Sequence, residues 1–180
     1  MAHSEKNHPY VALARRTVER YLSHEAPPRS GGEIDTREEM WNIRRACFVS
    51  IKTTDGELRG CIGTVTPAYP SLDMEIIGNA ISSSTRDPRF PPMKNNELDG
   101  VVFSVDVLGE PEKVRDSTEL DPKKWGIVVS KGMRRGVLLP DLEGVATVEA
   151  QIEIASRKAG IYDTDGISIE RFSVDRYSEQ

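Results

Sequence analysis

The segment from Leu58 to Thr64 brings a thiol and a guanidinium together, because Arg59 and Cys61 stand two positions apart in it. In an extended strand, residues two apart point to the same face. A neighbouring positive charge favours the thiolate, which is the nucleophilic form of cysteine. Glycine inside a strand marks a bulge or a close approach by a ligand or another backbone. We therefore take Cys61 as the candidate nucleophile or redox thiol, within a candidate ligand-binding surface formed by Arg59, Gly60, Ile62 and Gly63.

The second charged segment is Arg86-Asp87-Pro88-Arg89-Phe90-Pro91-Pro92, where three prolines forbid a helix and stiffen the backbone. Guanidinium groups bind carboxylate or phosphate through two parallel hydrogen bonds. Arg59, Arg86 and Arg89 could therefore form an anion site, with Phe90 lining the same pocket. The alternative is a set of salt bridges, with Asp87 as a partner, that hold this loop in place. The sequence leaves both interpretations open.

A catalytic cysteine also needs a general base, and the sequence offers few candidates. Its histidines are His3, His8 and His24, of which His24, at the end of the first predicted helix, is the one to consider. A solvent-exposed helix end explains His24 equally well. Cys61 itself could be a small side chain where two elements pack tightly. No spacing typical of a metal site, a nucleotide-binding loop or an iron–sulfur cluster is present, so we expect no metal and no cofactor.

A β-hairpin is predicted to position Cys61. Asp55-Gly56, between two apolar extended runs, favours a two-residue turn. The resulting register pairs Thr54 with Glu57, Ile51 with Gly60, Val49 with Ile62 and Ser50 with Cys61. One face then carries Cys47, Val49, Ile51, Leu58 and Ile62, which is typical of a core, while Arg59 and Cys61 lie on the other face.

The rest of the chain predicts helices packed on a largely antiparallel sheet. Before the hairpin we expect a helix capped by Asn7 and reaching Leu22, and a short helical piece within Arg37–Arg45. After it we expect a helix that follows Pro70 and buries Leu72, Ile76, Ala80 and Ile81, and then a strand over Val101–Val107. The remaining elements are a charged loop over Gly109–Lys124, a hairpin over Ile127–Leu139, a helix over Gly144–Ala159, and a strand over Ile167–Val174 with an irregularity near Arg171. Without regular alternation of strands and helices, the fold class is α+β.

Length and composition narrow the class of protein. A chain of 180 residues suits one domain, with room for a small lobe and with residues 1–7 as a loose tail. The net charge of −5 argues against nucleic-acid binding. The longest apolar run is too short to cross a membrane, and the polar N-terminus has no signal-peptide pattern. Two cysteines provide no disulfide framework, so we expect a cytoplasmic protein that binds no membrane.

The same motifs resemble the AMMECR domain family. The resemblance rests on Leu58–Thr64 and Asp87–Pro92, and on four further matches that follow the family's order, namely Ala12–Arg15, Ala46–Val49, Arg134–Pro140 and Arg157–Gly160. It implies an α+β fold of the AMMECR type and a likeness to protein A of the AmmeMemoRadiSam system. That system is named for association with a Memo-like protein and a radical-SAM protein, which the resemblance therefore implies as partners.

Two functions are compatible with these residues. The first is a non-catalytic subunit that binds a small molecule or a partner in a pocket around Arg59–Gly63 and acts with the Memo-like and radical-SAM proteins. The second is a small-molecule enzyme that uses Cys61, with Arg59 and Arg89 holding an anionic substrate. The absent base favours the first, and the thiol beside an arginine favours the second.

Overall fold

The computed structural model describes residues 7–29 and 41–180, and its chain divides into two compact units. One unit runs to Val107 and includes Arg176–Gln180, and the other is Leu108–Asp175. Of the predicted helical piece over Arg37–Arg45, residues 37–40 lie outside the described residues; in the remainder only Trp41 is helical, so no helix continues to Arg45. The predicted tail also lies outside the described residues, except for its last residue.

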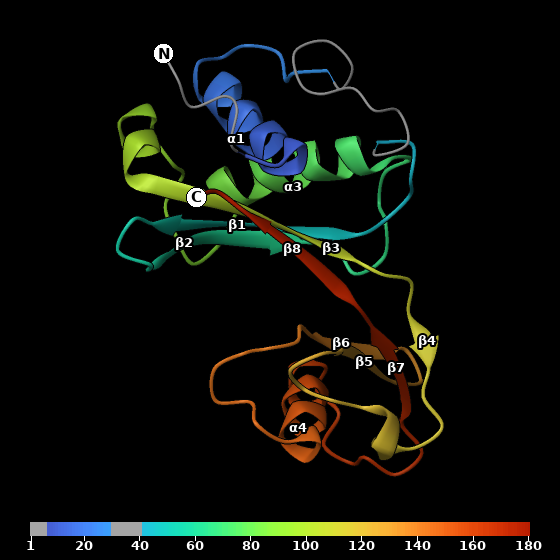
Figure 1. The fold of residues 1–180 in the computed structure, drawn as a ribbon. Helices are drawn as coiled ribbons and strands as arrows, with labels where there is room; N and C mark the ends of the chain where they lie inside the picture. Colours follow the sequence, from blue (N-terminus) through green and yellow to red (C-terminus); the bar gives the residue numbers. More distant parts are fainter. Residues whose placement is uncertain (1–6, 30–40) are drawn as a thin grey trace. The chain divides into compact units, whose positions relative to one another are not determined.

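In its described residues, the first unit is a four-stranded sheet with the helices α1 and α3 on one face (Figure 1). Its strands are β1 (Cys47–Thr53), β2 (Leu58–Gly63), β3 (Val101–Leu108) and β8 (Val174–Ser178), in the order β2-β1-β3-β8. The helices are α1 (Pro9–Leu22) and α3 (Leu72–Thr85), and the 3-10 helix η1 (Asn95–Gly100) precedes β3. The core between the sheet and the helices includes Cys47, Val49, Ile51, Phe103, Val105, Leu13, Val18 and Ile76.

The β1–β2 hairpin has the predicted register in its centre and a different one near its turn. Val49 pairs with Ile62, Ser50 with Cys61 and Ile51 with Gly60, which places Cys47 and Cys61 on opposite faces. After Ile51 the register shifts by one residue, so Lys52 pairs with Leu58 and the predicted pairing of Thr54 with Glu57 is wrong. The Thr53 N–H donates to the Glu57 carbonyl at 2.8 Å, so the loop is Thr54-Asp55-Gly56 and the predicted two-residue turn at Asp55-Gly56 is wrong as well. The bulge turns Leu58 away from the core, where we expected it, and leaves it exposed.

Helix α1 begins one residue later than predicted. His8 is its N-cap, and the His8 ring nitrogen Nδ1 accepts a hydrogen bond of 3.3 Å from the backbone N–H of Tyr10. The His8 ring also stacks on Tyr177, with 4.0 Å between the ring centroids. An imidazole can cap a helix because its unprotonated nitrogen accepts a hydrogen bond as a Ser or Asn oxygen would. The predicted cap Asn7 was therefore wrong.

Helix α3 buries a polar stripe beside its apolar one. Leu72, Ile76 and Ala80 are fully buried as predicted, whereas Ile81 is only half-buried. Glu75, Asn79 and Ser83, each four residues after the last, are buried as well, because residues four apart share a helix face. Each of them binds backbone or hydroxyl groups of β1, β2 or the segment that follows β2.

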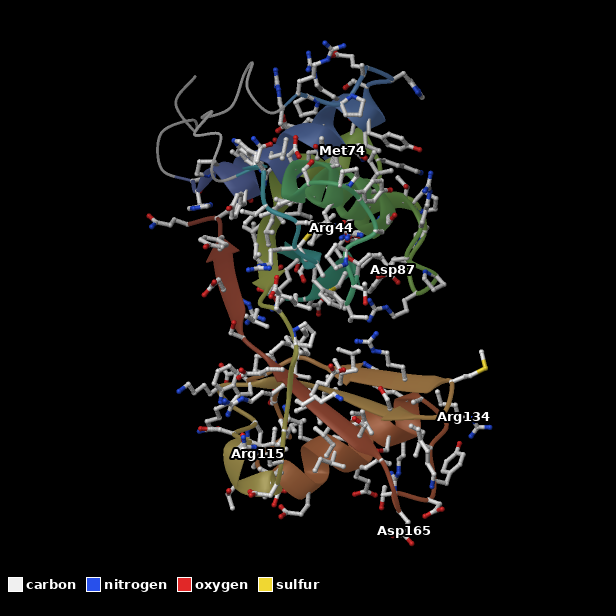
Figure 2. All side chains as sticks on the ribbon, turned by 90° about the vertical axis from the view of Figure 1, so that its right-hand side faces the viewer. Arg44, Met74, Asp87, Arg115, Arg134 and Asp165 are labelled. Atoms are coloured by element: carbon white, nitrogen blue, oxygen red, sulfur yellow. The ribbon has the colours of Figure 1, made fainter. Side chains whose placement is uncertain are left out.

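The second unit is a sheet of its own with the helix α4 (Val148–Lys158) packed on it. Its strands are β4 (Glu112–Lys113), β5 (Gly126–Lys131), β6 (Arg134–Leu138) and β7 (Ser168–Phe172), in the order β4-β7-β5-β6, with every neighbouring pair antiparallel. The 3-10 helix η2 (Ser117–Glu119) follows β4. Figure 2 shows Arg134 at the end of the β5–β6 hairpin and Asp165 on the loop before β7.

Three boundaries in this part of the chain differ from the prediction. The charged loop over Gly109–Lys124 contains β4 and η2, because Glu112 and Lys113 pair with β7. Helix α4 begins only at Val148, where the Thr147 hydroxyl caps it by accepting from Ala150 N–H. The predicted last strand is split at Ser173 rather than disturbed near Arg171, since β7 and β8 belong to different sheets.

Helices and antiparallel sheets thus confirm the α+β class. Within the described ranges, no helix is long and apolar enough to cross a membrane.

Candidate functional site

Cys61 lies on β2, the edge strand of the first sheet, and the loop after α3 covers that edge. The Cys61 N–H donates to Asp87 Oδ2 at 3.0 Å, and the Cys61 carbonyl accepts from Arg89 Nη2 at 3.2 Å. Figure 2 shows Asp87 on this loop, close to the strand. Unpaired backbone groups at a sheet edge can pair with another chain. Asp87 and Arg89 satisfy those of Cys61 from within the same unit.

Asp87 is a buried carboxylate held by several donors. It is 3% exposed, and it receives Arg89 Nε at 2.9 Å, Arg89 Nη2 at 2.7 Å and the Arg89 backbone N–H at 3.1 Å. The Arg89 guanidinium, followed by the backbone N–H donors, keeps the pKa of Asp87 well below its usual range in spite of burial. Asp87 therefore stays ionised near neutral pH and is a poor general base.

Arg59 is paired in the same way, with Glu97 of η1. Arg59 Nε lies 2.7 Å from Glu97 Oε2, and Arg59 Nη2 donates to Glu97 Oε1 at 3.2 Å and to the Pro91 carbonyl at 3.0 Å. The Arg59 hydrogen bond lowers the pKa of Glu97. Each guanidinium of this site thus has its own carboxylate, which leaves little net charge to attract an anion.

Phe90 is close to both arginines. The Arg59 Cζ atom is 5.9 Å from the centroid of the Phe90 ring, and the Arg89 Cζ atom is 5.6 Å from it. Both distances are within the range of a cation–π contact. The ring and the two guanidinium groups form a half-exposed cluster at the edge of β2, which we call the Phe90 cluster (Arg59, Arg89 and Phe90).

Gly60 and Gly63 allow close approach by other parts of this chain. A methyl group built on Gly60 would overlap the carbonyl oxygen of Ser83, and one built on Gly63 would overlap the ring of Phe48. The Ser83 hydroxyl joins the two strands, since it accepts the Ile62 N–H at 2.8 Å and donates to the Val49 carbonyl at 2.6 Å. The glycine at position 60 is therefore required by helix packing, not by a ligand.

The two thiols differ in their surroundings. Cys47 is fully buried, and burial raises the pKa of its thiol to about 12, although Asn79 Nδ2 donates to the sulfur at 3.4 Å. Cys61 is half-buried, and the Ser50 hydroxyl donates to its sulfur at 3.1 Å. Neither cysteine forms a disulfide.

We expect an alkylating reagent at pH 8 to modify Cys61 long before Cys47. A thiol with a pKa of about 12 is almost entirely protonated at that pH, and only the thiolate reacts. Mass spectrometry of peptides after timed exposure to iodoacetamide measures both rates. Faster modification of Cys47, or modification of Cys61 only after unfolding, would contradict the proposal of an accessible thiol on β2.

The histidines do not complete a pair with Cys61. His8 caps α1 and stacks on Tyr177, so it has a structural role. His24 lies just past the end of α1 and lines a groove together with Arg86. His3 lies outside the described residues. The hydrogen bonds between described residues give the Cys61 sulfur the hydroxyl of Ser50 and no imidazole or carboxylate.

The structure thus brings five of the predicted site residues together: Arg59, Cys61, Asp87, Arg89 and Phe90 meet where β2 contacts the loop after α3. Gly60 and Ile62 contact Ser83 of α3 instead, Gly63 packs on Phe48, and Arg86 lines the groove described above. Two residues at this place were not predicted from the sequence: Glu97, which neutralises Arg59, and Ser83, which holds β1 and β2 together. The four-residue spacing of Glu75, Asn79 and Ser83 could have revealed the polar stripe, while nothing in the sequence pairs Arg59 with a residue 38 positions away. Across residues 7–29 and 41–180, no group of three His, Cys, Asp or Glu residues is placed to hold a metal ion.

Comparison with known proteins gives a consistent result. The AMMECR1 family model matches residues 11–180. A protein from Thermotoga maritima is 51% identical over 171 residues, which cover 94% of this chain and 97% of that protein. A protein from Clostridium acetobutylicum is 46% identical over 180 residues, which cover 97% of this chain but 37% of that protein. In that relative the matched region is one part of a longer chain.

A solved structure shows the same fold. The crystal structure of an uncharacterised protein from Pyrococcus horikoshii superposes with a TM-score of 0.84 and 32% sequence identity, covering 95% of this chain and 90% of the other.

Proposed function

Because the chain belongs to the AMMECR1 family, we propose that it is a non-catalytic binding subunit that acts with Memo-like and radical-SAM proteins, through the surface around Arg59–Gly63. The observation that carries this proposal is the pairing of every charged group at the site. Asp87 is neutralised by Arg89 and Glu97 by Arg59, so neither carboxylate is poised to take a proton from Cys61. The site is held rigid by these pairs, which suits recognition more than reaction.

The composition of the Phe90 cluster supports contact with a protein partner. Arginine and aromatic side chains are enriched in the cores of protein interfaces, and arginine also among the residues that contribute most binding energy. The Arg89 side chain is 55% exposed although its guanidinium is already held by Asp87. A positioned, partly exposed arginine loses little conformational freedom when it binds. The relative from Clostridium acetobutylicum supports an association as well, because there the domain is continuous with a longer chain.

The test is complex formation by purified proteins. The Memo-like and radical-SAM proteins of the same genome are titrated into the wild-type domain and its variants by calorimetry. We expect Phe90→Ala to weaken binding by about tenfold or more, the loss typical of an interface residue of high energy. Cys61→Ser, which exchanges only sulfur for oxygen within the same surface, should weaken binding far less than Phe90→Ala does. Tyr162→Ala, at an aromatic side chain that is 85% exposed in the second unit, is the matched control.

The competing function is a small-molecule enzyme that uses Cys61 on an anionic substrate. It is favoured by one observation, that the Cys61 thiol is less buried than that of Cys47. Absence of any complex, together with a turnover that Cys61→Ser abolishes, would overturn the binding subunit in favour of this enzyme.

A further inference from the structure

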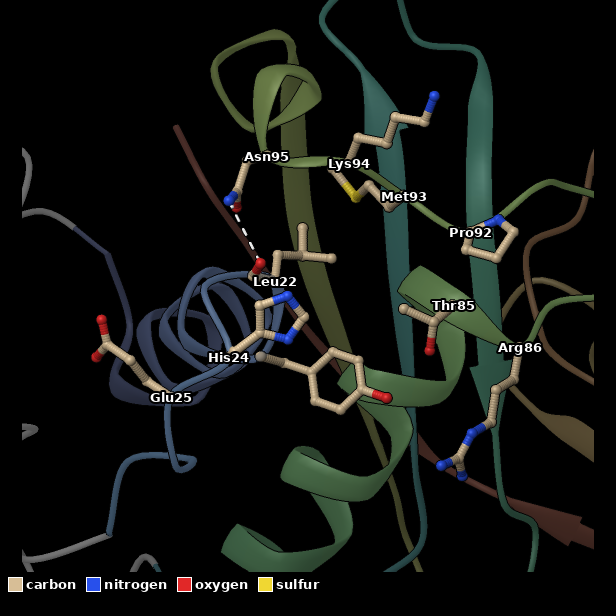
Figure 3. A pocket seen from close by; sticks show the side chains of 10 residues that line it. Leu22, His24, Glu25, Thr85, Arg86, Pro92, Met93, Lys94 and Asn95 are labelled. Atoms are coloured by element: carbon tan, nitrogen blue, oxygen red, sulfur yellow. Dashed lines mark hydrogen bonds between the residues drawn. The ribbon is translucent and has the colours of Figure 1, made fainter.

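A groove of about 820 Å³ lies in the first unit, between the ends of two helices and the segment before η1. It is lined by residues at the end of α1, by Thr85 and Arg86 at the end of α3, and by the run from Pro92 to Asn95 (Figure 3). The volume is in the range of small-molecule sites. The function proposed above makes no use of this groove.

The walls of the groove are apolar and fixed in position. Leu22, Pro92 and Met93 are among its lining residues, and Met93 is 3% exposed. The Met93 N–H donates to the Ser84 carbonyl at 2.8 Å, and Asn95 Nδ2 donates to the Leu22 carbonyl at 3.3 Å. These bonds tie the loop to both helices, and Figure 3 shows the second as a dashed line across one end of the groove. A ligand would therefore meet a largely pre-formed apolar surface.

The charged residues of the groove are mostly basic, in a chain whose net charge is −5. Arg86 and Lys94 lie on its rim, and His24 lies between them and the end of α1. Neither Arg86 nor His24 makes a side-chain hydrogen bond or ion pair with a described residue. The single acidic residue, Glu25, is paired with Arg20 at 3.3 Å. Solvated charges at the rim of a groove are common, so these basic residues alone do not indicate an anion site. The backbone conformation of His24 is the second observation.

His24 occupies a backbone position where glycine is the usual residue. Helix α1 ends with the Glu25 N–H on the Arg20 carbonyl at 2.8 Å and the His24 N–H on the Tyr21 carbonyl at 3.1 Å. This pattern places His24 in the left-handed region, with a φ of 59°. A side chain there is strained relative to glycine, and strained residues tend to occur where their side chain serves a function. The residue in this strained conformation is the one whose imidazole lines the groove.

We propose that this groove binds a small organic anion with an apolar body and a carboxylate or phosphate group. The apolar body lies on Leu22, Pro92 and Met93, and His24 and Arg86 donate hydrogen bonds to the anionic group. Arg86 points outward in Figure 3, and its long, unpaired side chain is free to turn towards the ligand. Lys94 adds attraction without a defined contact.

Calorimetry with phenyl phosphate and 4-phenylbutyrate tests whether the groove binds such anions. Two half-probes serve as controls: inorganic phosphate has the anionic group without an apolar body, and benzyl alcohol has the apolar body without a charge. We expect both organic anions to bind at least about tenfold more tightly than either half-probe, because charge-assisted hydrogen bonds and apolar burial both contribute. Arg86→Gln should weaken binding of the organic anions by about tenfold, since it removes the charge and the guanidinium donors and leaves a shorter, neutral polar side chain. Arg157→Gln, at an exposed arginine in the second unit, should change nothing.

His24→Gly separates a binding role from a structural one. Glycine relieves the backbone strain, so the melting temperature should stay the same or rise, while affinity for the organic anions falls about fivefold or more. Undetectable binding at about 10 mM, equal binding of benzyl alcohol, or unchanged affinity in both His24→Gly and Arg86→Gln would overturn the proposal. These outcomes are independent of Cys61 and the Phe90 cluster, so they leave the function proposed above untouched.

Discussion

Gly60→Ala is expected to destabilise the protein by about 3 kcal/mol, the upper part of the range for overpacking. The added methyl group would overlap the backbone carbonyl of Ser83, which cannot rotate away as a side chain can. Relief requires α3 to move off β2, and that movement would break the Ser83 bridge between Ile62 and Val49. Urea unfolding followed by circular dichroism measures the loss.

Gly100→Ala is the matched control, since a methyl group there has no heavy atom within 4 Å. We expect it to change stability by no more than about 0.5 kcal/mol, as is usual for surface substitutions. A Gly60→Ala protein as stable as this control would show that Gly60 is not placed for helix packing, and the interpretation of that glycine as a ligand contact would return.

The sequence predicted most elements of the fold because their signals are local. The alternation of Val101, Phe103, Val105 and Val107 and the position of the β1–β2 hairpin around Asp55-Gly56 depend on neighbours within a few residues. The register of β1 and β2 was right in its centre for the same reason. It was wrong beyond Ile51, because a bulge depends on what the strand must meet in three dimensions, and Arg59 is placed there to reach Glu97 and Pro91.

The sequence predicted which of these candidate residues are neighbours, but not which hydrogen bonds and ion pairs they form. Arg59, Cys61, Asp87 and Arg89 were chosen correctly as neighbours from residue types and from the resemblance, but the two alternatives for the arginines differ only in their partners. Salt bridges are the alternative that the structure contains, since both guanidinium groups are paired with carboxylates. Such pairings form between distant segments, and no sequence periodicity encodes them.

Arg89→Ala is expected to cost about 3 kcal/mol, because it leaves the Asp87 carboxylate buried without its cation. We place the value at the low end for a broken buried pair, since the Arg89 side chain is 55% exposed and water can take part of its place. If Arg89 served only to bind a ligand, Arg89→Ala would leave the free energy of unfolding unchanged. Thermal and urea unfolding of the variant decide between these results.

A double-mutant cycle with Asp87→Asn tests the cause of that loss. If the unpaired carboxylate is what destabilises Arg89→Ala, then replacing it by a neutral amide should recover part of the stability, so the double variant should be more stable than Arg89→Ala alone. A double variant that is less stable by the sum of both single losses would mean that the two residues act independently.

The pH dependence of stability is a second test of the pairing between Arg89 and Asp87. The pKa of Asp87 is lower in the folded protein than in the unfolded chain, so its contribution to stability is fully present above the unfolded pKa of about 4. That contribution is lost as the pH falls towards the folded pKa, because a protonated Asp87 no longer needs the cation. The gap in stability between wild type and Arg89→Ala should therefore be constant from pH 8 to about pH 5 and narrow below about pH 4. A gap that stays constant in acid would show that Arg89 stabilises the loop through the Cys61 carbonyl and packing rather than through Asp87.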